Sequence, residues 1–489
     1  MFKFSSTHKH IFHCLLLISI IIYFEIQSGA LKLWYTDDDI GDFDPFVRYG
    51  RYLAWFLYVF RLLTLLPLPQ VLFNFFGLIF FNAFPEDPKL DKTPLMMPFI
   101  CIRTVTRGDY PELVTKNVER NLNLCLDSGL ENFIIEIVSD KSFELPKHPR
   151  IRLTVVPSSY RTKSGALFKA RALQYCLEDN VNSLNDNDWI VHLDEETLLT
   201  SGSLAGIVKF ICDGKYHFGQ GLITYANEGV VNWLTTLSDA FRVAEDMGKL
   251  RFQFYVFHKP IFSWKGSYVV TLCRAERDVS FDNGPDGSIA EDCYFSMIAF
   301  KKGYTFNFIE GEMWEKSPFT LMDCLQQRKR WLQGIFLVVH SKNIPLKIKF
   351  FLSMSLYAWA TLPLSLANLV FAIIYPLPAS DWCNFISTFV GALTFYLYIF
   401  GVFKSFEIEK IGYIKYSIIL AAALLTIPLK AIIEIIAVIW GLLTNKHKFF
   451  VVQKQIQSSP SSSSSSSQET TTKDDLQHEY INGRVIEQV

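Results

Sequence analysis

Apolar residues run together at both ends of the chain and leave a middle stretch of mixed polarity. Near the N-terminus they fill residues 11–24 and 51–67, which we interpret as membrane spans. The first run is short for a bilayer and would also suit a signal peptide. The Phe-rich patch at 70–84 is more interrupted and predicts an interfacial helix. We therefore expect residues 1–91 to anchor the chain in a membrane.

Three further apolar runs follow the middle stretch, at residues 350–375, 384–403 and 416–442. Pro428 interrupts the last of them, so we expect a broken helix there. Together these runs predict a transmembrane region over 346–445. The remaining segment, 446–489, is rich in Ser and cannot bury a core, so it is predicted to be disordered.

Basic residues orient this C-terminal region. Lys residues precede its first apolar run and follow its second, whereas the connector 376–383 has neither Lys nor Arg. Because basic loops stay on the cytosolic side, the middle domain is predicted to face the cytosol. The nine scattered cysteines include no CxxC pair and no zinc-type spacing, which favours reduced thiols and agrees with that side.

Within residues 92–345, apolar β-rich segments alternate with helical ones. The predicted strands are 98–105, 132–138, 151–156 and 189–193, and the predicted helices between them are 111–126 and 165–177. This alternation predicts an α/β domain with a mostly parallel, doubly wound sheet. Ligands of such sheets bind beyond the carboxyl ends of the strands.

Composition narrows the class of protein. Half of the residues are hydrophobic and 19% are charged, whereas soluble chains average about 25% charged residues. The deficit favours a membrane protein. The formal net charge of −1 gives no general attraction for nucleic acid.

Two acidic clusters carry the candidate chemistry. Asp194 and Glu196 follow the strand 189–193 directly, and such carboxylates hold Mg²⁺ or Mn²⁺ together with substrate phosphates. Asp292 lies at the start of a predicted helix, where an ionised carboxylate could accept a proton from a hydroxyl. Taken alone, each cluster would more often be a solvated turn or a helix-start acid. Ser288 to Glu291 reads as a capping box that would account for Glu291.

A third cluster is a basic and aromatic helix. Gln327, Arg330 and Trp331 are spaced to share one helical face, and Thr320 offers an N-cap. Arg suits a phosphate, and Trp suits a sugar ring or a packing contact. Arg328 and Lys329 lie on other faces of that helix, and we predict that they form a basic rim near the membrane.

Weaker signals suggest a nucleotide site. Lys163 and Gly165 lie in a loop, and Lys169 lies at the following helix start, where a diphosphate could bind. Asp140 follows the second strand, and Thr104 lies near the end of the first.

Together these segments resemble the inverting family-2 glycosyltransferases, which have a GT-A fold. Asp194-Glu195-Glu196 looks like the metal-binding DxD motif, although Asp is usual at position 196. Ala290-Glu291-Asp292 looks like the motif that carries the base, residues 327–331 match Q-x-x-R-W, and residues 169–173 look like K-A-x-A-L. The resemblance implies a divalent metal and roles in donor binding for Thr104, Asp140, Lys163, Gly165 and Lys169.

More closely, the stretches HLDEETLLT, NGPDGSIAEDCYF and QQRKRWLQGI resemble invertebrate β-1,4-mannosyltransferases of glycosphingolipid synthesis. That resemblance implies GDP-mannose as donor, glucosylceramide as acceptor, and a multi-pass protein of the endoplasmic reticulum or Golgi. The residues themselves indicate only a membrane-tethered diphosphate-sugar site. A processive polysaccharide synthase and a membrane scaffold with an inactive transferase domain stay open as alternatives.

Overall fold

The computed structural model describes residues 5–29, 44–90, 97–378 and 380–445. Within them a seven-stranded sheet has the order β3-β2-β1-β4-β6-β5-β7. Its strands are β1 (Ile100–Thr106), β2 (Phe133–Ser139), β3 (Ile151–Val155), β4 (Trp189–Leu193), β5 (Phe218–Thr224), β6 (Val269–Leu272) and β7 (Phe306–Trp314). The predicted strands correspond to β1 to β4. The strands β5, β6 and β7 were not predicted from the sequence.

The sheet is mixed rather than simply parallel. β6 runs antiparallel to both of its neighbours, β4 and β5, whereas the other pairs of named strands are parallel. Antiparallel neighbours run in opposite directions, so β6 points against β4 and β5. As a result, β6 begins at the edge where the other strands end. The prediction of a mostly parallel sheet is corrected in this respect.

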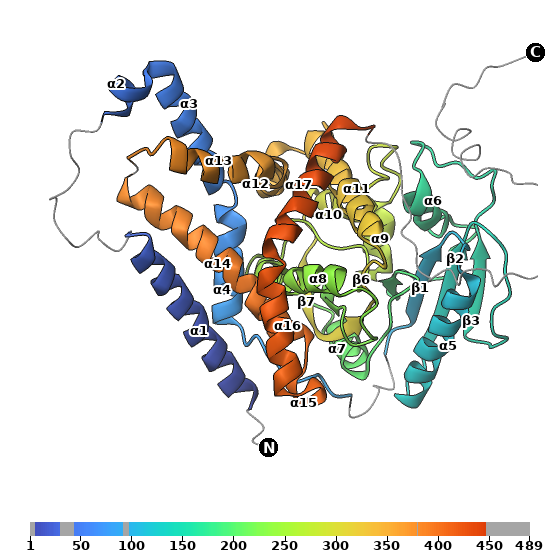
Figure 1. The fold of residues 1–489 in the computed structure, drawn as a ribbon. Coiled ribbons are helices and arrows are strands. Elements are labelled where there is room, and N and C mark those ends of the chain that lie inside the picture. Colours follow the sequence, from blue (N-terminus) through green and yellow to red (C-terminus); the bar gives the residue numbers. More distant parts are fainter. Residues whose placement is uncertain (1–4, 30–43, 91–96, 379, 446–489) are drawn as a thin grey trace, which may run out of the picture. The chain divides into compact units, whose positions relative to one another are not determined.

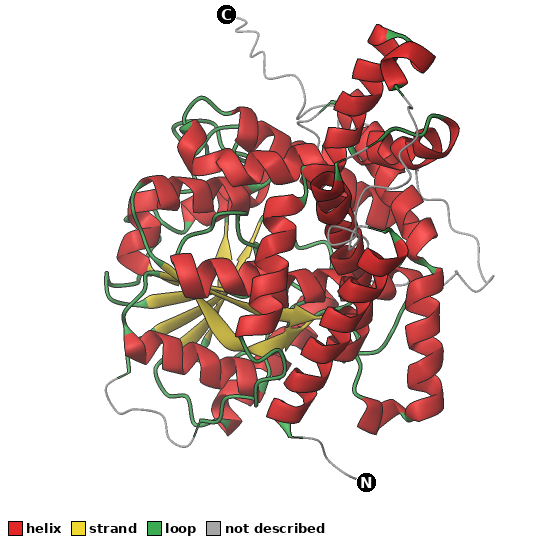
Figure 2. Ribbon diagram, turned by 90° about the vertical axis from the view of Figure 1, so that its left-hand side faces the viewer, coloured by secondary structure: helices red, strands yellow, loops and turns green. Residues whose placement is uncertain are grey.

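Helices cover both faces of the sheet, as Figure 2 shows. Ile137 of β2 packs in the main core with Val114 of α5, whereas the next residue, Val138, packs with Ala172 of α6 on the opposite face. Buried strands of this kind are apolar on both sides. The helices and helical turns of this region are α5 (Pro111–Asp127), α6 (Phe168–Tyr175), α7 (Ser201–Asp213), α8 (Trp233–Glu245), η3 (Asp246–Leu250), η4 (Gln253–Phe257), α9 (Cys273–Val279), α10 (Glu291–Lys301) and α11 (Leu321–His340).

The remaining described helices are mostly apolar, and several pack against one another, such as α1 with α14 (Figure 1). They are α1 (Ser6–Gln27), α2 (Pro45–Tyr49), α3 (Arg51–Leu62), η2 (Leu63–Leu65), α4 (Leu68–Phe80), α12 (Leu346–Ala360), α13 (Leu362–Ile374), α14 (Asp381–Ser405), α15 (Ile408–Ile411), α16 (Tyr413–Leu425) and α17 (Ile427–Leu443).

Three helical stretches among the described residues are long and apolar enough to cross a membrane: Ser6–Gln27, Arg51–Phe80 and Asp381–Ser405. The run predicted at 51–67 and residues 70–80 of the patch predicted at 70–84 thus fall within one 30-residue stretch. Two bent helix pairs, α12 with α13 (56°) and α16 with α17 (45°), are further candidates. The second bend lies next to Pro428, where the sequence predicts a broken helix. The Ser-rich segment 446–489 lies outside the described residues.

Close helix packing joins the apolar helices to the sheet domain. Gly401 of α14 lies against the backbone of α8, and a Cβ there would stand 2.2 Å from the Ala240 carbonyl oxygen. Only glycine permits this approach. All nine cysteines are unpaired, as their scattered positions predict.

Candidate active site

Asp194 begins the site at the carboxyl end of β4. Its backbone N–H donates to Ser267 Oγ (3.1 Å), and its side chain, 38% exposed, accepts from Lys169 Nζ (2.6 Å). Ser267 lies just before β6, so the reversed strand supplies part of this edge. The position of Asp194 at a strand end agrees with the sequence analysis.

Lys169 joins the two acidic clusters. Its ammonium also donates to the Gly266 carbonyl (3.2 Å) and lies 3.8 Å from Glu291 Oε1. Burial alone would lower the pKa of Lys169, but Asp194 and Glu291 outweigh it and raise that pKa. The structure therefore brings the segment after β4 and the start of α10 to one place. From the sequence we expect Lys169 to meet a diphosphate, and in the structure its partners are the carboxylates of Asp194 and Glu291.

Asp292 lies in the first turn of α10, where its Oδ1 accepts from the Cys293 N–H (2.7 Å). Burial raises the pKa of Asp292, and Asp194 adds to the rise, whereas Lys169 and Arg330 oppose it. Burial and Asp292 together raise the pKa of Glu291 to about 7. Asp194, Asp292 and Arg330 therefore share one electrostatic environment, although they are far apart in the chain.

The predicted capping box is wrong. α10 begins at Glu291, its N-cap is Ala290, and no side chain caps it. Ser288 instead donates to the Gly284 carbonyl (2.7 Å) and accepts from the Leu167 N–H (2.8 Å). Its hydroxyl thus ties the loop before α10 to the loop before α6, because a tertiary contact competes successfully with local capping.

Glu195 and Glu196 lie in different environments. Glu195 is 7% exposed and accepts from Thr106 Oγ1 inside the domain. Glu196 is partly exposed, and it adds to the electrostatic field at a residue that the sequence analysis missed, Glu315.

Glu315 directly follows β7 and is 8% exposed. Its Oε1 accepts from Thr197 Oγ1 (2.5 Å), and burial, Glu196 and Asp194 raise its pKa to about 7. Leu198 pairs with Trp314, which brings the segment after β4 beside the end of β7. A carboxylate just after an apolar strand was the available signal, but β7 itself was not predicted.

Gly266 gives Asp292 its space. A Cβ at Gly266 would stand 3.2 Å from Asp292 Oδ2, a close contact that pushes that carboxylate aside. We expect Gly266→Ala to lower kcat/KM by about 10- to 100-fold, because small displacements of a reacting group are costly. Steady-state kinetics would measure it, and Gly391→Ala, which adds a Cβ in open space, is the matched control. Equal kinetics for both variants would contradict this prediction.

The Q-x-x-R-W residues lie on α11, which Thr320 caps as predicted by accepting from the Asp323 N–H (3.1 Å). Arg330 lowers the pKa of both Glu291 and Asp292, so its charge reaches the acidic pair. Gln327 Oε1 is buried and, among the described residues, accepts no hydrogen bond. These positions suit an anionic donor and a hydroxyl-bearing acceptor.

The predicted basic rim at Arg328 is wrong. Arg328 is 4% exposed, lies 4.6 Å from the Trp331 ring centroid and pairs with Asp239 (3.0 Å) and Glu434 (3.3 Å). Lys329 lies 4.3 Å from the Trp440 ring centroid. Helices α8 and α17 pack against α11, and the sequence of α11 could not reveal this coverage.

The remaining predicted donor-site residues are more dispersed. Asp140 pairs with Arg171 (2.5 Å), and Thr104 is buried in β1 between β2 and β4. Lys163 is exposed, and Gly165 has a φ of +78° that favours glycine. Their loop is held where the Ser164 N–H donates to Asp282 (2.8 Å). Among the described residues, no hydrogen bond or ion pair joins Asp140, Lys163 or Gly165 to Asp194 or Asp292.

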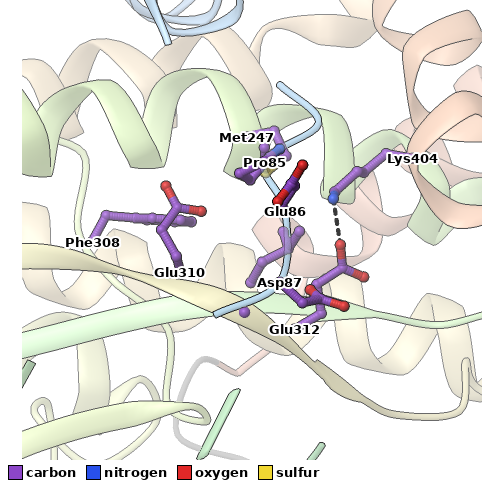
Figure 3. A pocket seen from close by; sticks show the side chains of 10 residues that line it. Pro85, Glu86, Asp87, Met247, Phe308, Glu310, Glu312 and Lys404 are labelled. Atoms are coloured by element: carbon purple, nitrogen blue, oxygen red, sulfur yellow. Dashed lines mark ion pairs between the residues drawn. The ribbon is translucent and has the colours of Figure 1, made fainter. Parts of the chain in front are cut away.

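A different pocket lies between the chain segment 85–87, β7 and α14 (Figure 3). It is acidic, but Lys404 pairs with Glu312, and Glu310 accepts from Arg251 (2.5 Å). Burial and Glu312 raise the pKa of Asp87. Because cations pair with Glu310 and Glu312, we interpret it as a packing seam between α14 and the sheet.

Another group of metal-type ligands occurs on α1, where spacing alone predicted no site. Cys14 Sγ lies 3.5 Å from His13 Nε2 and 3.7 Å from His10 Nε2. Both nitrogens of His13 are already engaged, with the Leu78 carbonyl (3.0 Å) and the Tyr396 hydroxyl (2.8 Å). We therefore interpret this group as helix packing.

The mixed sheet, its strand order and the acidic edge define a GT-A-like α/β fold. Residues 189–404 match the family "Glycosyl transferase family group 2". The chain is 61% identical to "Beta-1,4-mannosyltransferase egh" of Drosophila melanogaster, over 93% of this chain and 99% of that protein. It is 55% identical to "Beta-1,4-mannosyltransferase bre-3" of Caenorhabditis briggsae, over 92% and 99%.

Among solved structures, residues 1–349 of S. aureus TarS are 12% identical, with a TM-score of 0.33 and coverage of 61% of this chain and 82% of that one. The extent and identity of the curated matches identify the family. The chain belongs to the family-2 glycosyltransferases, in the same family as the egh and bre-3 proteins. This confirms the resemblance inferred from the motifs.

Proposed function

We propose that this protein transfers mannose from GDP-mannose to glucosylceramide in a β-1,4 linkage, with inversion. The observation that carries the proposal is 61% identity to the Drosophila mannosyltransferase over nearly the whole chain. The convergence of Asp194 and Asp292 around Lys169 supports a competent site.

Asp292 is the proposed general base. An attacking sugar hydroxyl must lose a proton as it displaces the diphosphate, and a positioned carboxylate can accept that proton. Gly266 leaves room beside Asp292, and Arg330 favours its ionised form. Arg330 would also bind the diphosphate, while Gln327 and Trp331 form the acceptor side.

A divalent metal ion, Mn²⁺ or Mg²⁺, fits the donor set. Asp194 already accepts from a cationic group and is partly exposed, and Glu196 follows it at the same edge. These two carboxylates would hold the ion, which neutralises the diphosphate leaving group. Lys169 would help bind the diphosphate.

We expect Asp194→Asn to weaken Mn²⁺-dependent GDP binding by more than about tenfold, because a neutral amide holds a divalent ion poorly. Equilibrium dialysis with and without Mn²⁺ would measure the loss. The exposed Asp213→Asn serves as the matched control. Wild-type binding by the Asp194 variant would remove Asp194 from the metal site.

The proposed cellular setting is a multi-pass protein of the endoplasmic reticulum or Golgi with the sheet domain in the cytosol. The helices that are long and apolar enough to cross a membrane support the membrane part. The division into an anchor region (1–91), a transferase domain (92–345) and a C-terminal membrane region (346–445) belongs to the same proposal.

The function is tested by a donor screen with purified membranes, followed by mass analysis of the lipid product. We expect transfer from GDP-mannose to added glucosylceramide and one added hexose per lipid. A long insoluble product formed without added lipid would favour a processive synthase. Lack of metal-dependent binding to every nucleotide sugar would favour an inactive scaffold.

A further inference from the structure

Glu434 is a carboxylate on α17, in the last apolar helix pair. Its side chain is 16% exposed, and its Oε1 lies 3.3 Å from Arg328 Nε. Its Oε2 accepts from Trp359 Nε1 of α12 (3.0 Å). One carboxylate therefore connects α11, α12 and α17. A charged residue in an apolar helix is costly and commonly serves a function.

Arg328 links Glu434 of α17 to Asp239 of α8. Its Nη2 donates to Asp239 Oδ1 of α8 (3.0 Å), and the same oxygen accepts from Arg242 Nη1 (3.0 Å). Asp239 and Arg328 are each at least nine-tenths buried. Two guanidinium groups thus share one carboxylate oxygen, and Glu434 supplies the second negative charge that Arg328 needs.

Both guanidinium groups lie against the indole of Trp331. The guanidinium carbon (Cζ) of Arg242 lies 4.4 Å from the Trp331 ring centroid, and that of Arg328 lies 4.6 Å from it. Cation–π contacts of this kind hold an indole in a defined orientation. Trp331 lies next to Arg330, whose charge reaches Asp292.

We propose that Glu434 is a positioning residue for the acceptor side of the site. It holds Arg328 against Trp331, so a carboxylate of the last apolar helix pair sets the orientation of the Trp331 indole. The inference rests on the proposed function only in assigning Trp331 to the acceptor. The neighbouring Lys430, which donates to the Ser238 carbonyl (3.0 Å), adds positive charge that Glu434 offsets.

The test compares Glu434→Gln with the double variant Arg328→Gln/Glu434→Gln. The amide oxygen introduced by Glu434→Gln would still accept from Trp359, so the single change removes mainly the charge. It leaves Arg328 partly unpaired and should lower thermal stability, whereas removing both partners should restore much of that stability. Trp359→Phe is the matched control, because it removes the other contact of Glu434 and keeps the ion pair.

We expect Glu434→Gln to raise the KM for glucosylceramide in mixed micelles about tenfold, with the KM for GDP-mannose changed less than about twofold. The double variant should regain stability but keep the high acceptor KM, since Trp331 has then lost one guanidinium. Recovery of acceptor KM together with stability would show a purely structural role and overturn the inference. An unchanged acceptor KM in Glu434→Gln would overturn it too.

A second measurement needs no substrate. Acrylamide quenching of tryptophan fluorescence is measured for each protein with and without the additional change Trp331→Phe. The difference between the two quenching constants reports how accessible Trp331 is. The accessibility of Trp331 should rise in Glu434→Gln and in the double variant but not in Trp359→Phe. Equal accessibility in all of these proteins would overturn the inference. If the wild type transfers no mannose to glucosylceramide, the proposed function fails, and this quenching result alone decides the role of Glu434.

Discussion

Replacing Asp292 by Asn is expected to lower kcat by about 10²- to 10⁴-fold, the usual contribution of a general base. The amide is nearly the same size and can still accept from the Cys293 N–H, but it cannot take a proton from a sugar hydroxyl. Donor binding should persist because Lys169 and Arg330 remain in place. Radiolabelled transfer to lipid would measure turnover, and GDP binding would measure donor affinity.

Two further variants separate Asp292 from its surroundings. Asp213→Asn changes an exposed carboxylate on α7 in the same way and should keep wild-type turnover. Glu291→Gln alters the adjacent acid, which lies beside Lys169, and should cost less than Asp292→Asn. If Glu291→Gln abolishes turnover while Asp292→Asn retains it, Glu291 rather than Asp292 is the base.

Replacing Arg103 by Met should destabilise the fold by about 3–5 kcal/mol, because it removes a buried cation that pairs with two buried carboxylates. Arg103 is 1% exposed in β1, and its guanidinium lies 2.8 Å from Glu136 and 3.4 Å from Glu276. Chemical denaturation in detergent would measure the loss. Arg274→Met, at an exposed position of α9, should change the free energy of unfolding little. Equal stability of the two variants would contradict the prediction.

One of these carboxylates, Glu136, predicts how the stability of the fold depends on pH. Burial alone would raise the pKa of Glu136, but Arg103 and Arg152 outweigh it and lower that pKa from 4.5 to about 2. Because the pKa of Glu136 is lower in the folded than in the unfolded protein, its ionised carboxylate stabilises the fold fully above pH 4.5. The contribution, about 3 kcal/mol, is lost as the pH falls from 4.5 to 2. Wild-type stability should therefore fall across that window, whereas Glu136→Gln should fall less steeply.

Local signals in the sequence were sufficient for several elements. Thr320 caps α11 as predicted, because an N-cap needs only its own hydroxyl and a backbone N–H three residues on. α10 ends at Lys301, two residues before Gly303, for a similar local reason, because the positive φ of that glycine suits a helix end. The strand end that presents Asp194 was also predictable, since the apolar run stops there.

Features that depend on distant contacts were not predictable in this way. Ser288 has the spacing of a capping residue, but it binds the loop before α6 instead. Arg328 reads as a surface cation until α8 and α17 cover it. Glu315 becomes a member of the acidic edge only because Leu198 pairs with Trp314.

The sequence by itself therefore determined the class of protein, the order of its polar motifs and the strand end that carries Asp194, because these depend on local patterns of apolar and polar residues. Only the tertiary structure decided that β6 runs in reverse, which places Gly266 beside Asp292 and Ser267 beside Asp194. It likewise decided that Lys169 joins the acidic clusters. The physical reason is that charges and backbone groups far apart in the chain are balanced only where folding brings them together.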